Sequence, residues 1–149
     1  MQSIHHVVPI AAPPTRVYEA ISTTRGLAGW WTTDVSGSAQ PGGVIAFGFT
    51  GEFDPEMRVT GLQPGERVTW ELAGGHPNWD GSSFEYELQP SGTGTLLRFW
   101  QHYGRQLSDD DYGIYNYNWG YYLESLRLLC ETGAGKPFEP EELVRATGS

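Results

Sequence analysis

The stretch DDDYGIYNYNWGYYLESLRLLCE, residues 109–131, decides the fold. Its bulky apolar residues recur at spacings of three and four, namely Tyr115, Trp119, Tyr122, Leu123, Leu126, Leu129 and Cys130. This spacing places them on one stripe of a helix. Asp109–Asp111 can cap and complement the positive start of that helix, and Gly133 suits its end. We therefore expect a long amphipathic helix that covers a second layer.

Short alternating segments, separated by Gly and Pro turn signals, precede this helix. Residues 3–10 predict a first strand, Pro13-Pro14 opens a short helix, and a second short helix or turn leads to Trp30-Trp31. Further strands are predicted at 44–49, 57–62, 67–72, 83–88 and 95–103. Hairpin-length connections make the sheet antiparallel, and one apolar face needs a cover. We predict an α+β two-layer sandwich of six or seven strands and the long C-terminal helix.

Length and charge limit the function. The 149 residues predict one domain at 1–136, followed by a loosely ordered tail at 137–149, where Pro137 and Pro140 oppose helix. The formal net charge of −9 argues against nucleic acid and anionic membrane surfaces as partners. Cys130 is the single cysteine, so it cannot form an internal disulfide. We see no signal peptide and no apolar run long enough to span a bilayer, so a cytoplasmic location is expected.

Motifs along nearly the whole chain carry a resemblance to a known family. They are Ala12-Pro13-Pro14, Val17, Ala20, Trp30-Trp31, Gly42-Gly43, Pro64-Gly65-Glu66-Arg67, Trp70, Gly94-Thr95, Trp119, Leu123, Ser125, Leu126, Glu131, Thr132, Gly133 and Lys136. In this order they resemble the SRPBCC (START-like, helix-grip) superfamily. The most similar subgroup is the stand-alone bacterial proteins related to the C-terminal domain of the activator of Hsp90 ATPase.

The resemblance implies a curved antiparallel sheet wrapped around the C-terminal helix, with a pocket between them. The superfamily contains lipid carriers, hormone receptors, aromatic polyketide cyclases and co-chaperone domains, so the fold does not choose among these functions. No catalytic set defines this subgroup.

Large side chains are expected to face one another across the two layers. We predict a ligand-binding set of Phe47, Phe49, Trp70, Phe84, Tyr86, Phe99, Gln101, Tyr115, Trp119 and Tyr122. Such rings can form a solid core, or they can line a cavity that suits a flat or extended apolar ligand. The resemblance favours the cavity. Gln101 could orient a ligand or plug the pocket mouth.

Candidates for other chemistry are few. His6, predicted to face inward, is the best single candidate for acid–base work, although a buried histidine is usually a satisfied core residue. His5 and His6 point to opposite faces of a strand, and no HExxH spacing or phosphate-binding loop occurs, so we expect no metal and no cofactor. The loop Gly74–Gly81, with His76 and Trp79, is either an anchor on the sheet or a lid over the pocket.

Three functions follow in order of preference. The first is non-catalytic binding of a small apolar or aromatic molecule. The second is an enzyme of the polyketide cyclase or dehydratase type, with His6 or a pocket tyrosine moving a proton. The third is a co-chaperone-like interaction module; we do not expect a chaperone partner because the resemblance covers one domain only. A homodimer is left open.

Overall fold

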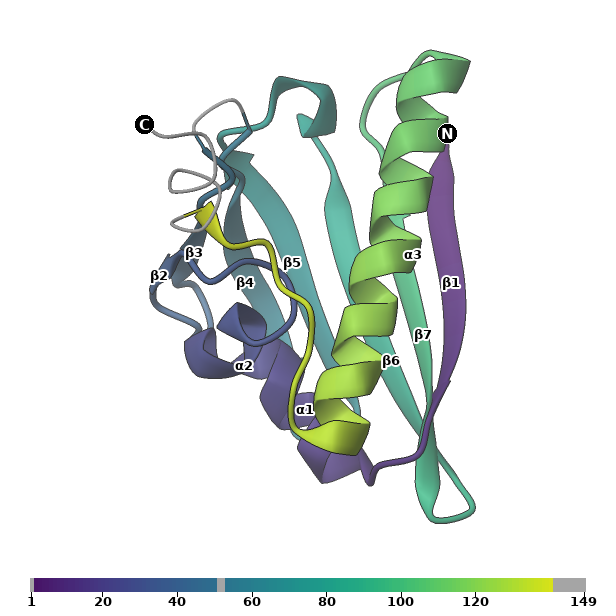
Figure 1. Cartoon of the computed structure of the whole chain (residues 1–149). Helices are drawn as coiled ribbons and strands as arrows, with labels where there is room; N and C mark the ends of the chain where they lie inside the picture. The colour runs from purple at the N-terminus through teal and green to yellow at the C-terminus, as the bar shows by residue number, and fades with distance from the viewer. Residues whose placement is uncertain (1, 51–52, 141–149) are drawn as a thin grey trace.

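A long helix lies across one face of an antiparallel sheet, and two short helices lie beside its C-terminal end (Figure 1). The computed structural model describes residues 2–50 and 53–140. In chain order the elements are β1 (Ser3–Ile10), α1 (Pro14–Ser22), α2 (Thr24–Ala28), β2 (Val35–Gly37), β3 (Val44–Phe47), β4 (Glu56–Gln63), β5 (Arg67–Gly74), the 3-10 helix η1 (Pro77–Trp79), β6 (Ser83–Ser91), β7 (Gly94–His102) and α3 (Asp109–Thr132). The predicted helix-grip α+β sandwich is confirmed.

The seven strands are arranged in the order β1-β7-β6-β5-β4-β3-β2, and each neighbouring pair is antiparallel. The strand that comes first in the chain therefore pairs with the last one, from Ser3 opposite His102 to Ile10 opposite Thr95. The predicted β4–β5 hairpin closes where Glu66 N–H donates to the Gln63 carbonyl at 2.9 Å. The three-residue strand β2 was not predicted, because so short a segment carries too little alternation to be recognised.

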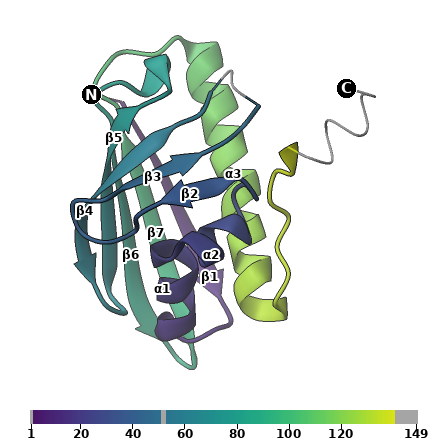
Figure 2. The ribbon, with the colours of Figure 1, turned by 90° about the vertical axis from the view of Figure 1, so that its left-hand side faces the viewer.

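The side of the sheet away from α3 is polar and carries ion pairs between neighbouring strands. Arg58 lies 3.4 Å from Glu71, Arg98 lies 3.3 Å from Glu87, and Arg67 pairs with Glu85. These side chains are partly exposed, so each pair contributes little to stability. The charged side chains therefore stay on the outer face of the sheet. The opposite face is apolar, and α3 covers it (Figure 2).

Both ends of α3 follow from local chemistry. The Ser108 Oγ accepts a hydrogen bond from Asp111 N–H at 3.1 Å, which satisfies one free donor of the first turn. At the other end Gly133 adopts a φ of 89°, a left-handed conformation that glycine enters without steric cost, and its N–H donates to the Leu129 carbonyl at 2.9 Å. The predicted start and end of this helix are confirmed to within one residue.

After α3 the chain turns back and runs beside α2 (Figure 1). We call residues Ala134–Pro140 the C-terminal strap. Phe138 N–H donates to the Trp31 carbonyl at 2.8 Å, and Thr33 N–H donates to the Phe138 carbonyl at 2.9 Å. A side chain on Gly135 would overlap the Gly29 carbonyl oxygen, so the close approach requires glycine.

The strap includes the first residues of the predicted tail and packs against the domain. Residues 137–140, expected to begin a loosely ordered tail, are held to the core through Phe138, which forms a parallel bridge with Thr32 and packs on Phe49 at 5.4 Å between ring centroids. The physical reason is that proline opposes helix but not an extended segment. Residues 141–149, the rest of that tail, lie outside the described residues.

Candidate functional site

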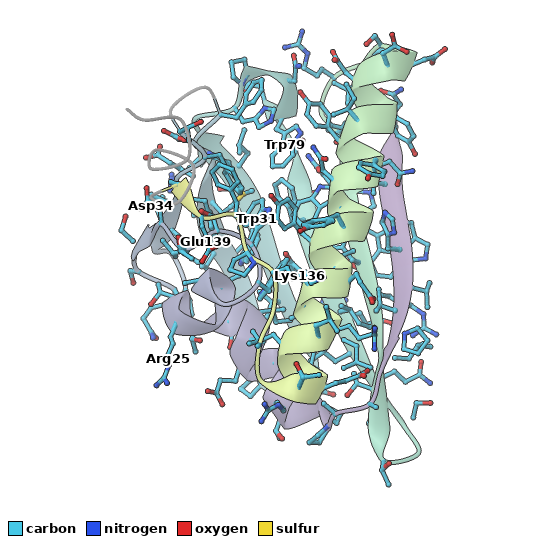
Figure 3. The ribbon with its side chains drawn as sticks, in the orientation of Figure 1. Arg25, Trp31, Asp34, Trp79, Lys136 and Glu139 are labelled. Carbon is cyan, nitrogen blue, oxygen red and sulfur yellow. The ribbon has the colours of Figure 1, made fainter. Side chains whose placement is uncertain are left out.

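A pocket of about 230 Å³ lies beside the N-terminal half of α3. The residues that line it are Trp31, Phe49, Phe53, Pro55, His76, Trp79, Ile114, Tyr115, Asn118, Trp119 and Tyr122. Those from α3 are spaced by one helical turn and form one wall. The opposite wall comes from loops, because Trp31 follows α2 and Trp79 ends η1; both indoles lie between α3 and the sheet (Figure 3). The pocket is therefore built by a rigid helix on one side and by connections on the other.

Stacked tryptophans form the inner end of the pocket. Trp119 lies 5.1 Å from Trp31 and 5.9 Å from Trp79 between ring centroids, with planes inclined by 29° and 17°. Phe49 meets Trp31 edge-on at 5.4 Å and Tyr122 edge-on at 6.3 Å. Offset stacked and edge-to-face pairs are favourable ring arrangements. Ring contacts between the lining residues therefore hold the two walls of the pocket in place.

Four of the ten predicted site residues line this pocket: Phe49, Tyr115, Trp119 and Tyr122. The other six are at most 1 % exposed and lie outside the pocket lining, namely Phe47, Trp70, Phe84, Tyr86, Phe99 and Gln101. Their rings interlock, as in the pairs Tyr86–Phe99 at 5.0 Å and Phe99–Trp119 at 4.4 Å. Ring packing fills the centre of the two layers, and open space remains at one end.

Gln101 uses its amide inside the core. Its Oε1 accepts from Trp119 Nε1 at 2.8 Å and from the Tyr103 hydroxyl at 3.2 Å, and its Nε2 donates to Ser82 Oγ at 3.3 Å. A buried amide is stable only when such partners are present. Gln101 therefore lies in the core, where its amide positions Trp119, and not at the pocket mouth.

His6 lies on the helix side of β1 but away from the pocket. Its Nε2 shares a hydrogen bond with Asn116 Oδ1 at 3.0 Å. Because β1 is an edge strand, this contact stands at the margin of the two layers, where the side chain is partly exposed. The residue that the sequence singled out for proton transfer is not among those lining the pocket.

The histidine that does line the pocket is His76, in the loop whose role was left open. Its ring is 5 % exposed and stacks on Trp79 at 4.1 Å and on Phe53 at 4.4 Å. Its Nδ1 has no hydrogen-bond partner among the described residues. Burial lowers the pKa of His76 to about 4, so the imidazole is neutral at pH 7. The loop thus forms a wall of the pocket through His76 and Trp79.

The depressed pKa of His76 predicts a pH dependence of stability. In the unfolded chain its pKa is near 6.5, so the unfolded state binds the proton more readily. The stabilisation is fully present above pH 6.5 and is lost as the pH falls towards 4. We expect the free energy of unfolding to fall by about 2 kcal/mol from this group between pH 7 and pH 5. Urea titrations of the natural protein and of His76→Phe at both pH values separate the contribution of this histidine. If the free energy of unfolding fell equally in the two proteins, the low pKa would not belong to His76.

The described residues form neither a metal-binding cluster nor a membrane-spanning helix. No cluster of three or more His, Cys, Asp or Glu side chains in residues 2–50 and 53–140 is placed to hold a metal ion. No helix in the same residues has both the length and the apolar character of a membrane span.

Comparison with known proteins places the chain in a family. The model of the family described as "Activator of Hsp90 ATPase homolog 1-like protein" matches residues 11–131. A comparison with curated proteins found no match.

Among solved structures, the Aha1 dimer from Colwellia psychrerythraea, a solution structure, is 34 % identical with a TM-score of 0.80, covering 91 % of this chain and 100 % of that one. A Mesorhizobium loti protein is 22 % identical with a TM-score of 0.74, covering 86 % and 96 %. CalU16 from Micromonospora echinospora is 19 % identical with a TM-score of 0.70, covering 98 % and 82 %. The last two likenesses concern the fold alone.

Proposed function

The chain belongs to the Activator of Hsp90 ATPase homolog 1-like family, within the SRPBCC helix-grip superfamily, and we propose that it binds a small apolar or aromatic molecule in the pocket beside α3 without catalysis. One observation carries this proposal: a pocket of about 230 Å³ whose wall is mostly aromatic. Sites for small molecules are typically concave and apolar with a few polar groups, and this one has that composition.

The pocket has room for a useful ligand. A cavity of about 150 Å³ can hold benzene, so a pocket of about 230 Å³ suits a molecule of about two fused rings. The best very small ligands gain up to about 1.5 kcal/mol per non-hydrogen atom. A ligand of about ten such atoms could therefore reach micromolar affinity without a charged contact.

Chemistry on the ligand is less well supported. The described lining residues include no Asp, Glu, Lys or Arg side chain. The low pKa of His76 makes it a weak base, and burial together with the neighbouring Tyr121 raises the pKa of Tyr122. A cyclase-type enzyme needs a group that gives or takes a proton near neutral pH. The pocket supplies hydrogen-bonding and stacking surfaces instead.

Filling the pocket tests the proposal. Asn118→Trp adds an indole at an exposed lining position, so it should block the pocket while leaving the core intact. The matched control is Asn116→Trp, two residues along α3 and outside the lining. We expect two-ring aromatic probes such as 2-naphthol to bind the natural protein and the control, and at least 10-fold more weakly to Asn118→Trp, by isothermal titration calorimetry. Equal affinity in both variants, or no binding to the natural protein, would refute the proposal.

We include a homodimer in this proposal. The Colwellia psychrerythraea relative, 34 % identical, is described as a dimer. The exposed residues Ile114, Tyr117 and Tyr121 form a second apolar stripe on α3, which is consistent with a protein surface that meets a second copy.

A further inference from the structure

The pocket contains a buried polar side chain that no other described residue satisfies with a hydrogen bond. His76 is 5 % exposed and lines the pocket, and its Nδ1 has no hydrogen-bond partner among the described residues. A buried polar atom without a partner costs free energy, so natural structures rarely retain one without a reason. Trp79 Nε1 also lacks a well-formed bond, but it interacts with the Tyr103 hydroxyl. The His76 imidazole has a polar interaction only with its own backbone and has no well-formed hydrogen bond to another described residue.

The stacking around His76 determines where a partner can approach. Trp79 lies parallel to the imidazole within 2° at 4.1 Å, and Phe53 lies within 16° at 4.4 Å. Two nearly parallel rings at these distances cover the two faces of the imidazole. Tyr115 stands edge-on at 5.3 Å and occupies part of the rim, with its hydroxyl accepting from Asn78 Nδ2 at 2.9 Å. Only the ring edge remains for a ligand. Nδ1 has almost no exposed surface, so the ligand meets the part of this edge that lines the pocket.

The charge of the site restricts the ligand further. The described lining residues carry no formal charge at pH 7, since His76 is neutral there and the rest are apolar, aromatic or amide side chains. The protein as a whole has a net charge of −9. Transfer of an ion into an apolar pocket without a counter-charge is costly. A carboxylate or a phosphate would therefore be excluded from the interior.

We propose that His76 forms a hydrogen bond with a hydroxyl group on an uncharged, planar aromatic ligand of about two rings, an inference that rests on the proposed function. A neutral imidazole offers one donor and one acceptor, and a hydroxyl group can match either one. An ether oxygen can only accept. The site therefore prefers phenol-like compounds to ethers or hydrocarbons of the same shape.

The test compares matched probes on the intact protein. 2-Naphthol carries the hydroxyl group, 2-methoxynaphthalene keeps the oxygen but loses the donor, naphthalene lacks both, and 2-naphthoate adds a charge. A neutral hydrogen bond is worth about 0.5–1.5 kcal/mol, a ratio of roughly 2- to 12-fold. By calorimetry we expect 2-naphthol to bind about 5- to 10-fold more tightly than naphthalene, and 2-naphthoate more weakly than either.

Two variants assign the preference to His76. His76→Phe keeps a ring between Phe53 and Trp79 but removes the nitrogens, so 2-naphthol and naphthalene should bind it equally. His5→Phe is the matched control, because His5 also stacks on a tryptophan, Trp100 at 4.6 Å, but lies outside the lining. That variant should retain the preference. If His76→Phe does not fold, the ¹⁵N resonances of the His76 imidazole in the natural protein report the same bond, since 2-naphthol should shift them and naphthalene should not.

The outcomes separate the two proposals. Suppose that naphthalene and 2-naphthol bind the natural protein with equal affinity and that neither shifts the His76 imidazole resonances. The role of His76 is then refuted, while aromatic binding stands. If 2-naphthoate binds best, the uncharged class is wrong. If no probe binds, the proposed function fails, and the inference fails with it.

Discussion

We expect Trp119→Ala to lower the free energy of unfolding by about 4 kcal/mol, because removal of a buried tryptophan typically costs about 3–5 kcal/mol. The indole is 2 % exposed and touches Trp31, Trp79, Phe84 and Phe99 with ring centroids within 6.2 Å. Its loss would also leave Gln101 Oε1 without the donor that now lies at 2.8 Å. Urea denaturation followed by far-UV circular dichroism measures the effect.

Val7→Ala is the control at an exposed apolar position on β1, outside the stripe on α3. Val7 is 49 % exposed, so its truncation should change stability by less than about 0.5 kcal/mol. If Trp119→Ala cost as little as this control, Trp119 would not be a centre of the packed core. The two layers would then be held together elsewhere, against the arrangement described above.

The second large effect is expected at Ser125, which joins α3 to two other segments. Its Oγ donates to the Trp30 carbonyl at 2.8 Å and accepts from Lys136 N–H at 2.7 Å, and the residue is 1 % exposed. Ser125→Ala leaves both backbone groups without this partner. Since each unsatisfied group costs about 1–3 kcal/mol, we expect a loss of about 3 kcal/mol in the free energy of unfolding.

The same substitution should loosen the C-terminal strap before the rest of the protein unfolds. Limited proteolysis with mass spectrometry should show faster cleavage within residues 134–140 in Ser125→Ala. Ser83→Ala, at an exposed position on β6, should leave both stability and cleavage unchanged. An unchanged cleavage rate in Ser125→Ala would show that the strap is held by its other contacts, among them those of Phe138.

Much of the fold could be predicted because its signals are periodic. The spacing of Tyr115, Trp119 and Leu126 is that of a helix face, and the alternation around Trp70 and Phe84 is that of strands with one buried side. These patterns say which side chains point inward. They do not say how far apart the layers stand, which depends on how the rings interlock. For that reason the predicted cavity was too extensive, and its centre is filled.

The rest of the site could not be predicted because it lies on loops. Trp31, His76 and Trp79 follow no helical or strand period, so nothing in the pattern relates them to α3. Two signals were present: the Trp30-Trp31 pair directly after a weak helix, and a tryptophan in the glycine-bounded loop 74–81 that alternation does not require. A buried ring in a turn-rich segment must pack against other side chains. Here Trp31 and Trp79 pack against Trp119 and form part of the pocket wall.

The pairing of β1 with β7 has a consequence for how the chain folds during synthesis. Ser3 is matched with His102, so the first strand leaves the ribosome long before its partner exists. At about 5–20 residues per second, the interval is roughly 5–20 s. Throughout it the nascent chain exposes an unpaired strand whose polar backbone groups could pair with other chains. Pro9, which lacks an N–H donor, weakens that strand as a template during the wait.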